Sequence, residues 1–259
     1  MYLGLGLRLG SSTVTGFDAD AAAYFERAGV TDATAKNQIN AFVKGTKDLN
    51  LYNSMVCWPL RSAQNKGSGT TAYSLGGLGT YNASLVSGPT WSTDGVITTL
   101  AATSKITTAT PNNLLFANGT LAYVTKFETT FAGPYYHFWF PGAFQFIGFT
   151  GNALLQPTIQ GGANQAITTI DSPSPSTGAF EFKAFSINGS NVVANRNGST
   201  TTSVAQTQTP STVSTAHTLS NADATASIGW LFSASLSNAQ MVSLYTLYKN
   251  TMGTGLSLP

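Results

Sequence analysis

The acidic residues are the first candidates for acid–base chemistry, because a glycoside hydrolase needs two carboxylates a few ångströms apart across the sugar ring. The three glutamates are far apart along the chain: Glu26, Glu128 and Glu181. Asp18 and Asp20 are spaced by two, but they stand at a predicted helix start, where capping explains them better. Glu181 and Lys183 share one face of a predicted strand and are expected to form a solvated pair. The acids could still meet in space, yet their pattern favours a protein that is not an enzyme.

Nucleophilic and metal chemistry find little support. His137 lies in an aromatic run and His217 in a threonine-rich segment, and both are expected to be polar residues of apolar strands. No Gly-x-Ser-x-Gly elbow marks a nucleophile. The single cysteine, Cys57, excludes an internal disulfide and is expected to be a small buried residue. Zinc spacings, phosphate loops and dinucleotide fingerprints are absent from the sequence, so we expect no cofactor and no metal. A calcium ion held by Asp and Asn side chains stays open.

Aromatic side chains are the other chemical resource, because an exposed ring can stack on a sugar. The candidate glycan contacts are Trp91, Tyr135, Tyr136 and Trp139. The alternative is that they belong to the core, where most large aromatic residues of a sheet protein lie.

Composition narrows the class of protein. The chain has 259 residues, of which 42% are hydrophobic and only 8% charged, against about 25% charged in an average soluble domain. Its charged residues are spread along the chain, leave a net charge of +2 and form no run of basic residues. This pattern argues against nucleic-acid binding. No apolar run reaches the 18 residues or more of a membrane-spanning helix. We therefore expect a folded protein without nucleic-acid or membrane partners.

Two predicted helices must position the first third of the chain. Asp18 or Asp20 caps a helix that Gly29 ends, and a second helix begins near Thr31. Its apolar face has helical spacing at three residues: Ile39, Phe42 and Val43. A third helix follows a capping box of Ser237 and Gln240 and ends at Gly253, with an apolar stripe for packing on the rest of the protein. The stripe consists of Met241, Leu244, Tyr245 and Tyr248.

The segment from about Met55 to Ala234 reads as short strands separated by turns, which indicates an antiparallel sandwich or barrel. Alternation over residues 121–128 predicts a half-buried strand. Further strands are expected at 54–60, 95–101, 143–149, 180–187, 191–195 and 227–233. Asn-Gly pairs predict tight turns at 118–119, 188–189 and 197–198. Residues 199–215 are expected to form a long loop or an exposed edge.

The first fifteen residues are expected to form an extended arm, because leucine and glycine alternate with a period of two. Its apolar face would carry Leu3, Leu5, Leu7 and Leu9. Arg8 and the recurring glycines do not fit a secretory signal. Two readings stay open, a docking arm for a partner or an edge strand of the chain's own sheet.

Three groups of motifs occur in a fixed order along the chain. The helical lead-in carries Phe17-Asp-Ala-Asp20, Tyr24-Phe25, Ile39-Asn-Ala-Phe-Val43, Leu49, Tyr52, Met55 and Pro59-Leu60. A strand–turn–strand segment runs from Phe180 to Gly189. The closing strand and helix carry Ile228-Gly-Trp-Leu-Phe232, Leu236-Ser-Asn-Ala-Gln240 and Leu244-Tyr245. These motifs resemble concanavalin A-like (LamG-like) jelly-roll structural proteins of tailed bacteriophages. The acid pair of sandwich-fold glucanases is not visible, so that activity is not carried over.

The resemblance implies an all-β fold, a two-sheet antiparallel jelly-roll sandwich with a small N-terminal helical segment and a C-terminal helix. Three regions are expected: an arm at 1–15, a helical lead-in at 16–53 and the sandwich at 54–259. The expected function is that of a non-enzymatic virion protein on the particle exterior, as head decoration or attached to the tail or fibre. Its partners would be other capsid or tail proteins, with a homo-oligomer expected. The alternatives are a lectin-like module that binds host glycans and, less favoured, a glycoside hydrolase.

Overall fold

The computed structural model describes residues 16–99, 104–108, 118–128, 135–138, 144–150, 156–161, 168–169, 177–188, 191–200, 204–205, 217–220 and 223–259. The predicted arm, with Leu3, Leu5, Leu7 and Leu9, lies outside the described residues. Among the described helices, none is both long and apolar enough to cross a membrane.

The three predicted α-helices are present, although α3 ends at Asn250, before the predicted stop at Gly253. Helix α1 spans Ala19–Ala28, with Asp18 as its N-cap and Gly29 in the left-handed conformation at its end. Helix α2 spans Ala33–Asp48 and is capped by Asp32. Helix α3 spans Asn238–Asn250 and begins with the predicted capping box, in which Ser237 and Gln240 satisfy each other's backbone amides. Two 3-10 turns, η1 (Tyr52–Ser54) and η2 (Ser62–Gln64), flank the first strand.

Seventeen strands lie in the described part of the chain, and every pairing within the sheets is antiparallel. They are β1 (Met55–Pro59), β2 (Thr71–Ala72), β3 (Ala83–Val86), β4 (Thr90–Trp91), β5 (Val96–Thr98), β6 (Lys105–Thr108), β7 (Asn118–Phe127), β8 (Tyr135–Phe138), β9 (Phe144–Thr150), β10 (Gln156–Gly161), β11 (Thr168–Thr169), β12 (Phe180–Asn188), β13 (Asn191–Arg196), β14 (Ser199–Thr200), β15 (Val204–Ala205), β16 (His217–Ser220) and β17 (Ala224–Phe232).

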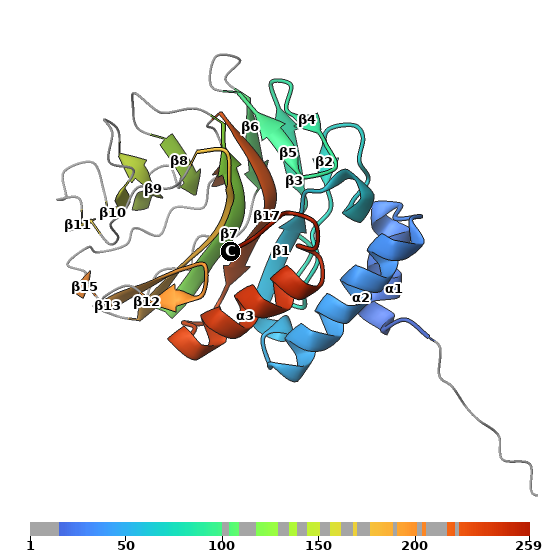
Figure 1. The fold of residues 1–259 in the computed structure, drawn as a ribbon, viewed down its shortest axis with the longest axis horizontal. Coiled ribbons are helices and arrows are strands. Elements are labelled where there is room, and N and C mark those ends of the chain that lie inside the picture. Colours follow the sequence, from blue (N-terminus) through green and yellow to red (C-terminus); the bar gives the residue numbers. More distant parts are fainter. Residues whose placement is uncertain are drawn as a thin grey trace, which may run out of the picture.

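The strands build the predicted jelly-roll sandwich. One layer is a nine-stranded sheet with the order β14-β13-β12-β7-β17-β5-β4, in which β1 also pairs with β17 and β15 with β13. The other layer consists of two four-stranded sheets, β16-β6-β3-β2 and β11-β10-β9-β8, which meet through contacts of β16 with β8. Figure 1 shows the long strands β7, β12 and β17 curving through the middle of the molecule.

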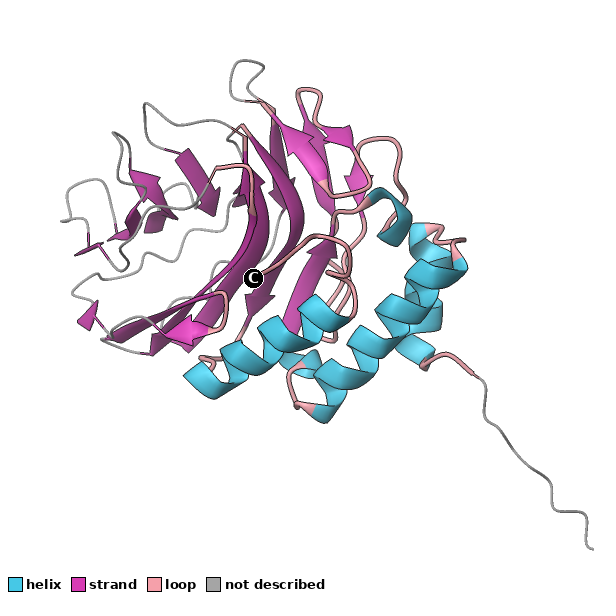
Figure 2. Ribbon diagram, viewed as in Figure 1, coloured by secondary structure: helices cyan, strands magenta, loops and turns pink. Residues whose placement is uncertain are grey.

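The central strands of the nine-stranded sheet, β7, β12 and β17, are buried on both faces. The three helices cover one face (Figure 2), where Phe42 of α2 lies 6.4 Å from Trp230 of β17 and the Tyr248 ring of α3 lies 5.1 Å from the same tryptophan, measured between ring centroids. On the other face, Leu121 and Phe185 pack in a second core with side chains of β2, β3 and β6. The prediction of a half-buried strand over 121–128 is therefore wrong, because helices cover the face that was expected to meet solvent.

A β-bulge at Ser227 lets β17 contribute to both cores. The register with β7 shifts between Ala226 and Ile228, so Ser227 is the extra residue. Ala224 and Ala226 face the core between the sheets, whereas Ile228, two residues further on, faces the helices. Side chains of a regular strand two residues apart would share a face, so the one inserted residue reverses the pattern.

The Asn-Gly turn predictions have different outcomes. Asn197 and Gly198 both have positive φ, 50° and 83°, and join β13 to β14 as predicted. The prediction at residues 118–119 is wrong, because both residues lie inside β7 and pair with Asn188 and Ile187 of β12. The neighbouring strand supplies their backbone partners, and this tertiary pairing overrides the local turn preference. For the pair at 188–189, β12 and β13 are hydrogen-bonded up to Asn188 and Asn191, and the residues between them lie outside the description.

Candidate functional site

A buried group of charges lies on the nine-stranded sheet, on the face that packs against the second layer. Glu181 and Lys183 alternate along β12 with residues that face the helices, and Arg196 stands opposite Lys183 on β13. The Lys183 Nζ atom lies 3.8 Å from Oε2 of Glu181, and the Arg196 guanidinium donates a hydrogen bond to Oε1 of the same carboxylate. Side-chain exposure is only 7% for Glu181, 2% for Lys183 and 16% for Arg196.

The prediction that Glu181 and Lys183 form a solvated pair is therefore wrong, because the pair is buried. The two residues do share a strand face, but β12 is an inner strand with β7 on one side and β13 on the other, and both of its faces are covered. Burial of one carboxylate with two cations requires close pairing, because desolvation of each charge is costly. This described cluster offers one carboxylate rather than the two that glycoside hydrolysis uses.

Asp18 and Asp20 both form ion pairs with one lysine. Lys47 of α2 lies 2.7 Å from Oδ1 of Asp18 and 2.6 Å from Oδ2 of Asp20. Asp18 also accepts the backbone N–H of Asp20 at 3.0 Å, which confirms its predicted capping role. Burial acts to raise the pKa of Asp18, but the hydrogen bond and charge of Lys47 outweigh it and hold that pKa below its usual value.

Three candidates for covalent or metal chemistry remain: Cys57, His137 and His217. The side chain of Cys57 is described, and it belongs to the hydrophobic core. Cys57 is fully buried in β1, as predicted, and burial raises the pKa of its thiol. His137 and His217 belong to β8 and β16, but their side chains lie outside the description. In the part of the chain that the structure describes, no three His, Cys, Asp or Glu residues group as metal ligands.

The predicted glycan contacts are only partly described. Trp91 of β4 is half-buried against the inter-sheet core, and its indole N–H donates to the Gly69 carbonyl at 3.0 Å, so it anchors a neighbouring loop. Tyr135 and Tyr136 are consecutive residues of β8, paired with Phe149 and Gly148, but their side chains lie outside the description. Trp139 lies outside it altogether. Of the four predicted glycan contacts, only Trp91 has a described side chain, so the described residues show no shared aromatic surface.

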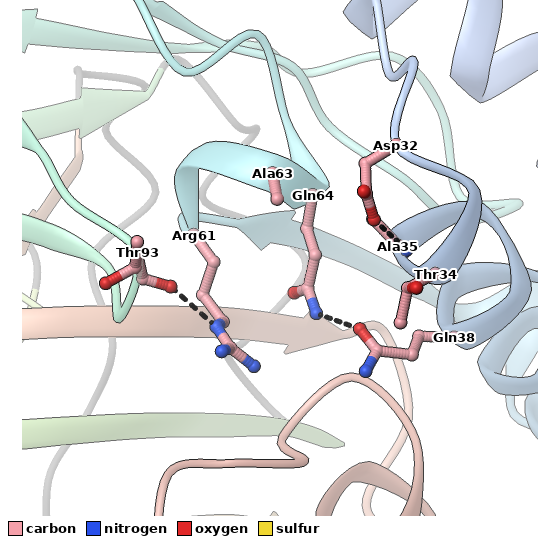
Figure 3. Close-up of a pocket in the computed structure, with 8 residues that line it drawn as sticks. All are labelled: Asp32, Thr34, Ala35, Gln38, Arg61, Ala63, Gln64 and Thr93. Carbon is pink, nitrogen blue, oxygen red and sulfur yellow. Dashed lines mark hydrogen bonds between the residues drawn. The ribbon is translucent and has the colours of Figure 1, made fainter.

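A cavity that sequence reasoning missed lies where the N-terminal part of α2 meets η2 (Figure 3). Its volume is about 240 Å³. Helix α2 contributes residues of its first turns, η2 contributes Gln64, and the residue before η2 is Arg61. The polar residues that line it are Asp32, Thr34, Gln38, Arg61, Gln64 and Thr93. They come from three segments distant in the sequence, so no motif spacing could have indicated the site.

The cavity ends at a buried residue. Gln64 is only 2% exposed, whereas Asp32 and Thr34 are exposed at the mouth. The Tyr24 hydroxyl donates to the backbone carbonyl of Gln64 at 2.8 Å, which fixes η2 against α1. The arrangement offers hydrogen-bond donors and acceptors side by side without a nucleophile activated by a base. It could hold a small ligand by hydrogen bonds.

Comparisons with known proteins give the fold. No protein-family model and no curated protein matches the sequence. Among solved structures, the botulinum neurotoxin serotype D binding domain matches with a TM-score of 0.55 and 12% identity, over 76% of this chain and 52% of that one. The Trypanosoma rangeli sialidase matches with a TM-score of 0.51 and 13% identity, over 83% of this chain and 39% of that one. The chain thus spans about half or less of each of these proteins, and at such identities the likeness concerns the fold of a β-sandwich.

Proposed function

We propose that the chain is a non-enzymatic structural protein on the exterior of a bacteriophage particle, where it docks on other capsid or tail proteins. The observation that carries the proposal is the integration of the helical lead-in with the sandwich. The segments that resemble phage proteins form one core, in which Phe42 of the lead-in contacts Trp230 of the closing strand and Tyr248 of the closing helix. This supports treating the resemblance as a property of the whole fold rather than of scattered short motifs.

The environments of four described acids also support a non-enzymatic role. Asp18 and Asp20 bind Lys47, and Asp32 caps α2. Glu128 accepts from the Thr225 hydroxyl at 2.7 Å and pairs with Lys126 at 3.2 Å. These carboxylates stabilise local structure, and such pairing differs from the free acid and base that hydrolysis requires.

An inventory of bacteriophage particles that carry this gene tests the proposal. Mass spectrometry of purified particles should find the chain in fixed stoichiometry to the major shell protein, with hundreds of copies for head decoration and a handful for a tail protein. Antibodies against the chain should label intact particles in electron micrographs. Absence from purified particles, or labelling only after the particles are broken, would contradict the proposal.

A lectin-like module is the second candidate function, favoured by the sandwich fold shared with a toxin binding domain and a sialidase. The proposal does not carry over the ligands of those proteins. A glycan array probed with the isolated protein tests it, and Trp139→Ala should abolish the binding if that ring stacks on sugar. Trp91→Ala serves as a comparison, because Trp91 already bonds to Gly69 within the protein.

A further inference from the structure

We propose that the groove between α2 and α3 holds the leucine face of this chain's own N-terminal arm, at residues 3–9. The groove has a volume of about 430 Å³ and lies at the surface of the helical layer. The inference does not depend on the particle role proposed above. It rests on the apolar lining of the groove, on one charge at its rim, and on the place where the arm joins the described residues.

The floor of the groove is aliphatic. Leu49 of α2 and Val242 and Leu247 of α3 line it, and each of these side chains is half-buried. Leu49 and Leu247 pack on the helical core from outside. A Cβ at Gly45 would collide with a terminal methyl carbon of Leu247, so the glycine lets this leucine lie against the α2 backbone. Such a lining favours an apolar occupant, because covering it removes apolar surface from water.

The length of the groove matches an extended leucine repeat. Gly45 and Leu49 lie about 6 Å apart along α2, and Val242 and Leu247 about 7.5 Å apart along α3, at 1.5 Å per residue. Alternate residues of an extended chain share one face and are about 6.7 Å apart. Two successive leucines of the arm therefore fit the groove. Glycines at positions 4 and 6 disfavour a helical arm and leave bare backbone on the side that faces water.

The charge at the rim is complementary to the arm. Asp48 is exposed and is the charged residue among those that line the groove. It forms no ion pair with any residue that the structure describes. Arg8 is the single charged residue among residues 1–17. With the leucines in the groove, Arg8 starts on the outer side of the arm, and its long flexible side chain can reach the rim.

The arm joins the described residues on the opposite flank of α2. The backbone N–H of Asp18 donates to Oδ1 of Asn40 at 2.7 Å, and the Asp18 carboxylate lies 2.7 Å from Nζ of Lys47. Leu49 follows Lys47 by two residues, or about 200° around the helix. Helix α2 lies between α1 and α3 (Figure 1). The arm must therefore cross α2, whose diameter with side chains is about 10–12 Å.

The segment before α1 is long enough for this crossing. Residues 10–16 read Gly-Ser-Ser-Thr-Val-Thr-Gly, a composition typical of a flexible linker. Seven such residues have a root-mean-square end-to-end distance of about 15 Å and reach about 23 Å when extended. A tether whose length matches its span gives an effective concentration in the millimolar range. In dilute solution the arm of the same chain therefore competes successfully with the arm of a second copy.

Trypsin cleavage of the full chain at Arg8 tests the inference. Arg8 is the one trypsin site among residues 1–17, and mass spectrometry quantifies the released peptide of residues 1–8. A free peptide of residues 1–16 gives the rate for an undocked arm. When docking is reversible and fast, the cleavage rate follows the undocked fraction.

Two substitutions weaken the groove without adding a trypsin site. Val242→Gln places a polar side chain in the lining. Its matched control is Val86→Gln, the same change at a half-buried valine of β3 in the other layer. Asp48→Asn removes the charge at the rim, and Asp94→Asn, in the turn between β4 and β5, is its control. Circular dichroism establishes that each variant is folded.

We expect Arg8 of the wild type to be cleaved about tenfold or more slowly than in the free peptide, a difference of about 1.4 kcal/mol. Val242→Gln should raise the rate by about threefold or more, because less apolar surface is covered, and Asp48→Asn by about twofold, because water screens an exposed pair. Both controls should match the wild type, and protection should not change with protein concentration.

Three results would overturn the inference. Arg8 of the wild type could be cleaved as fast as in the free peptide, Val242→Gln could be protected as the wild type is, or protection could rise with protein concentration, which would assign the arm to a second copy. If Val242→Gln does not fold, Thr246→Gln at the exposed rim of the groove replaces it. The particle inventory is unaffected by any of these results.

Discussion

Replacing Glu181 by glutamine removes the one carboxylate that the described residues place in the buried charge cluster, while keeping the size of the side chain. Lys183 and Arg196 then lose the ion pair that each forms with this carboxylate. Glu128→Gln is the matched control, the same substitution in a pair whose side chains are 39% and 25% exposed. The control also keeps an oxygen that accepts from Thr225.

The structure sets different magnitudes for the two variants. At the 3.8 Å separation of Lys183 from Glu181, an effective dielectric constant of about 20 gives an attraction of roughly 4 kcal/mol. Removing one member of a buried pair also leaves the other uncompensated, and such changes cost about 3–5 kcal/mol. An exposed pair such as Lys126 and Glu128 contributes at most about 1 kcal/mol, because water screens it.

Urea unfolding followed by tryptophan fluorescence measures both losses. Trp58 and Trp230 are almost fully buried, so their emission reports the loss of the core. We expect Glu181→Gln to lower the free energy of unfolding by several times the loss in Glu128→Gln. Equal losses in the two variants, or a loss below about 1 kcal/mol at position 181, would refute the assignment of a buried charge cluster.

Two further predictions follow from the backbone and from buried phenols. Gly95→Ala should lower the melting temperature more than Gly88→Ala. Both glycines have positive φ, so each alanine carries backbone strain, but only a Cβ at Gly95 would also lie 2.2 Å from a carbonyl oxygen of β17, whereas Gly88 has nothing within 4 Å. An equal shift would contradict the close approach of Gly95 to β17. Burial raises the pKa of Tyr24 and of Tyr248, so the folded protein keeps protons that the unfolded chain releases above about pH 10. Stability should therefore be complete below about pH 10 and fall above it by up to about 1.4 kcal/mol per pH unit for each tyrosine, which urea unfolding at about pH 9 and pH 11 would detect and a pH-independent result would contradict.

The helices were predictable because their signals are local. Asp18, Gly29 and the Ser237 capping box each act within a few residues of the chain, and each stands where the pattern places it. The strand–turn character of the middle region was equally clear, and its long strands β12 and β13 begin at the predicted residues. The closing strand begins three residues before its predicted start at 227, because Ala224–Ala226 pair with β5 and nothing in their own sequence signals this.

The environment of each strand face could not be predicted, because it depends on segments far away in the sequence. Lys183 has the pattern of a solvent-facing residue in β12, yet the rest of the fold covers it. The cavity at the start of α2 has the same origin, because Gln38, Arg61 and Thr93 meet only after the helices pack on the sheet. Local patterns thus indicated the elements, and tertiary packing determined the candidate sites.

The bulge at Ser227 has a consequence for how the protein loses its structure. Residues on one side of it fill the core between the sheets, and residues on the other side fill the core under the helices. Detaching β17 therefore empties part of both cores at once. Because the helical layer and the sandwich share this strand, we expect them to unfold together in one cooperative transition.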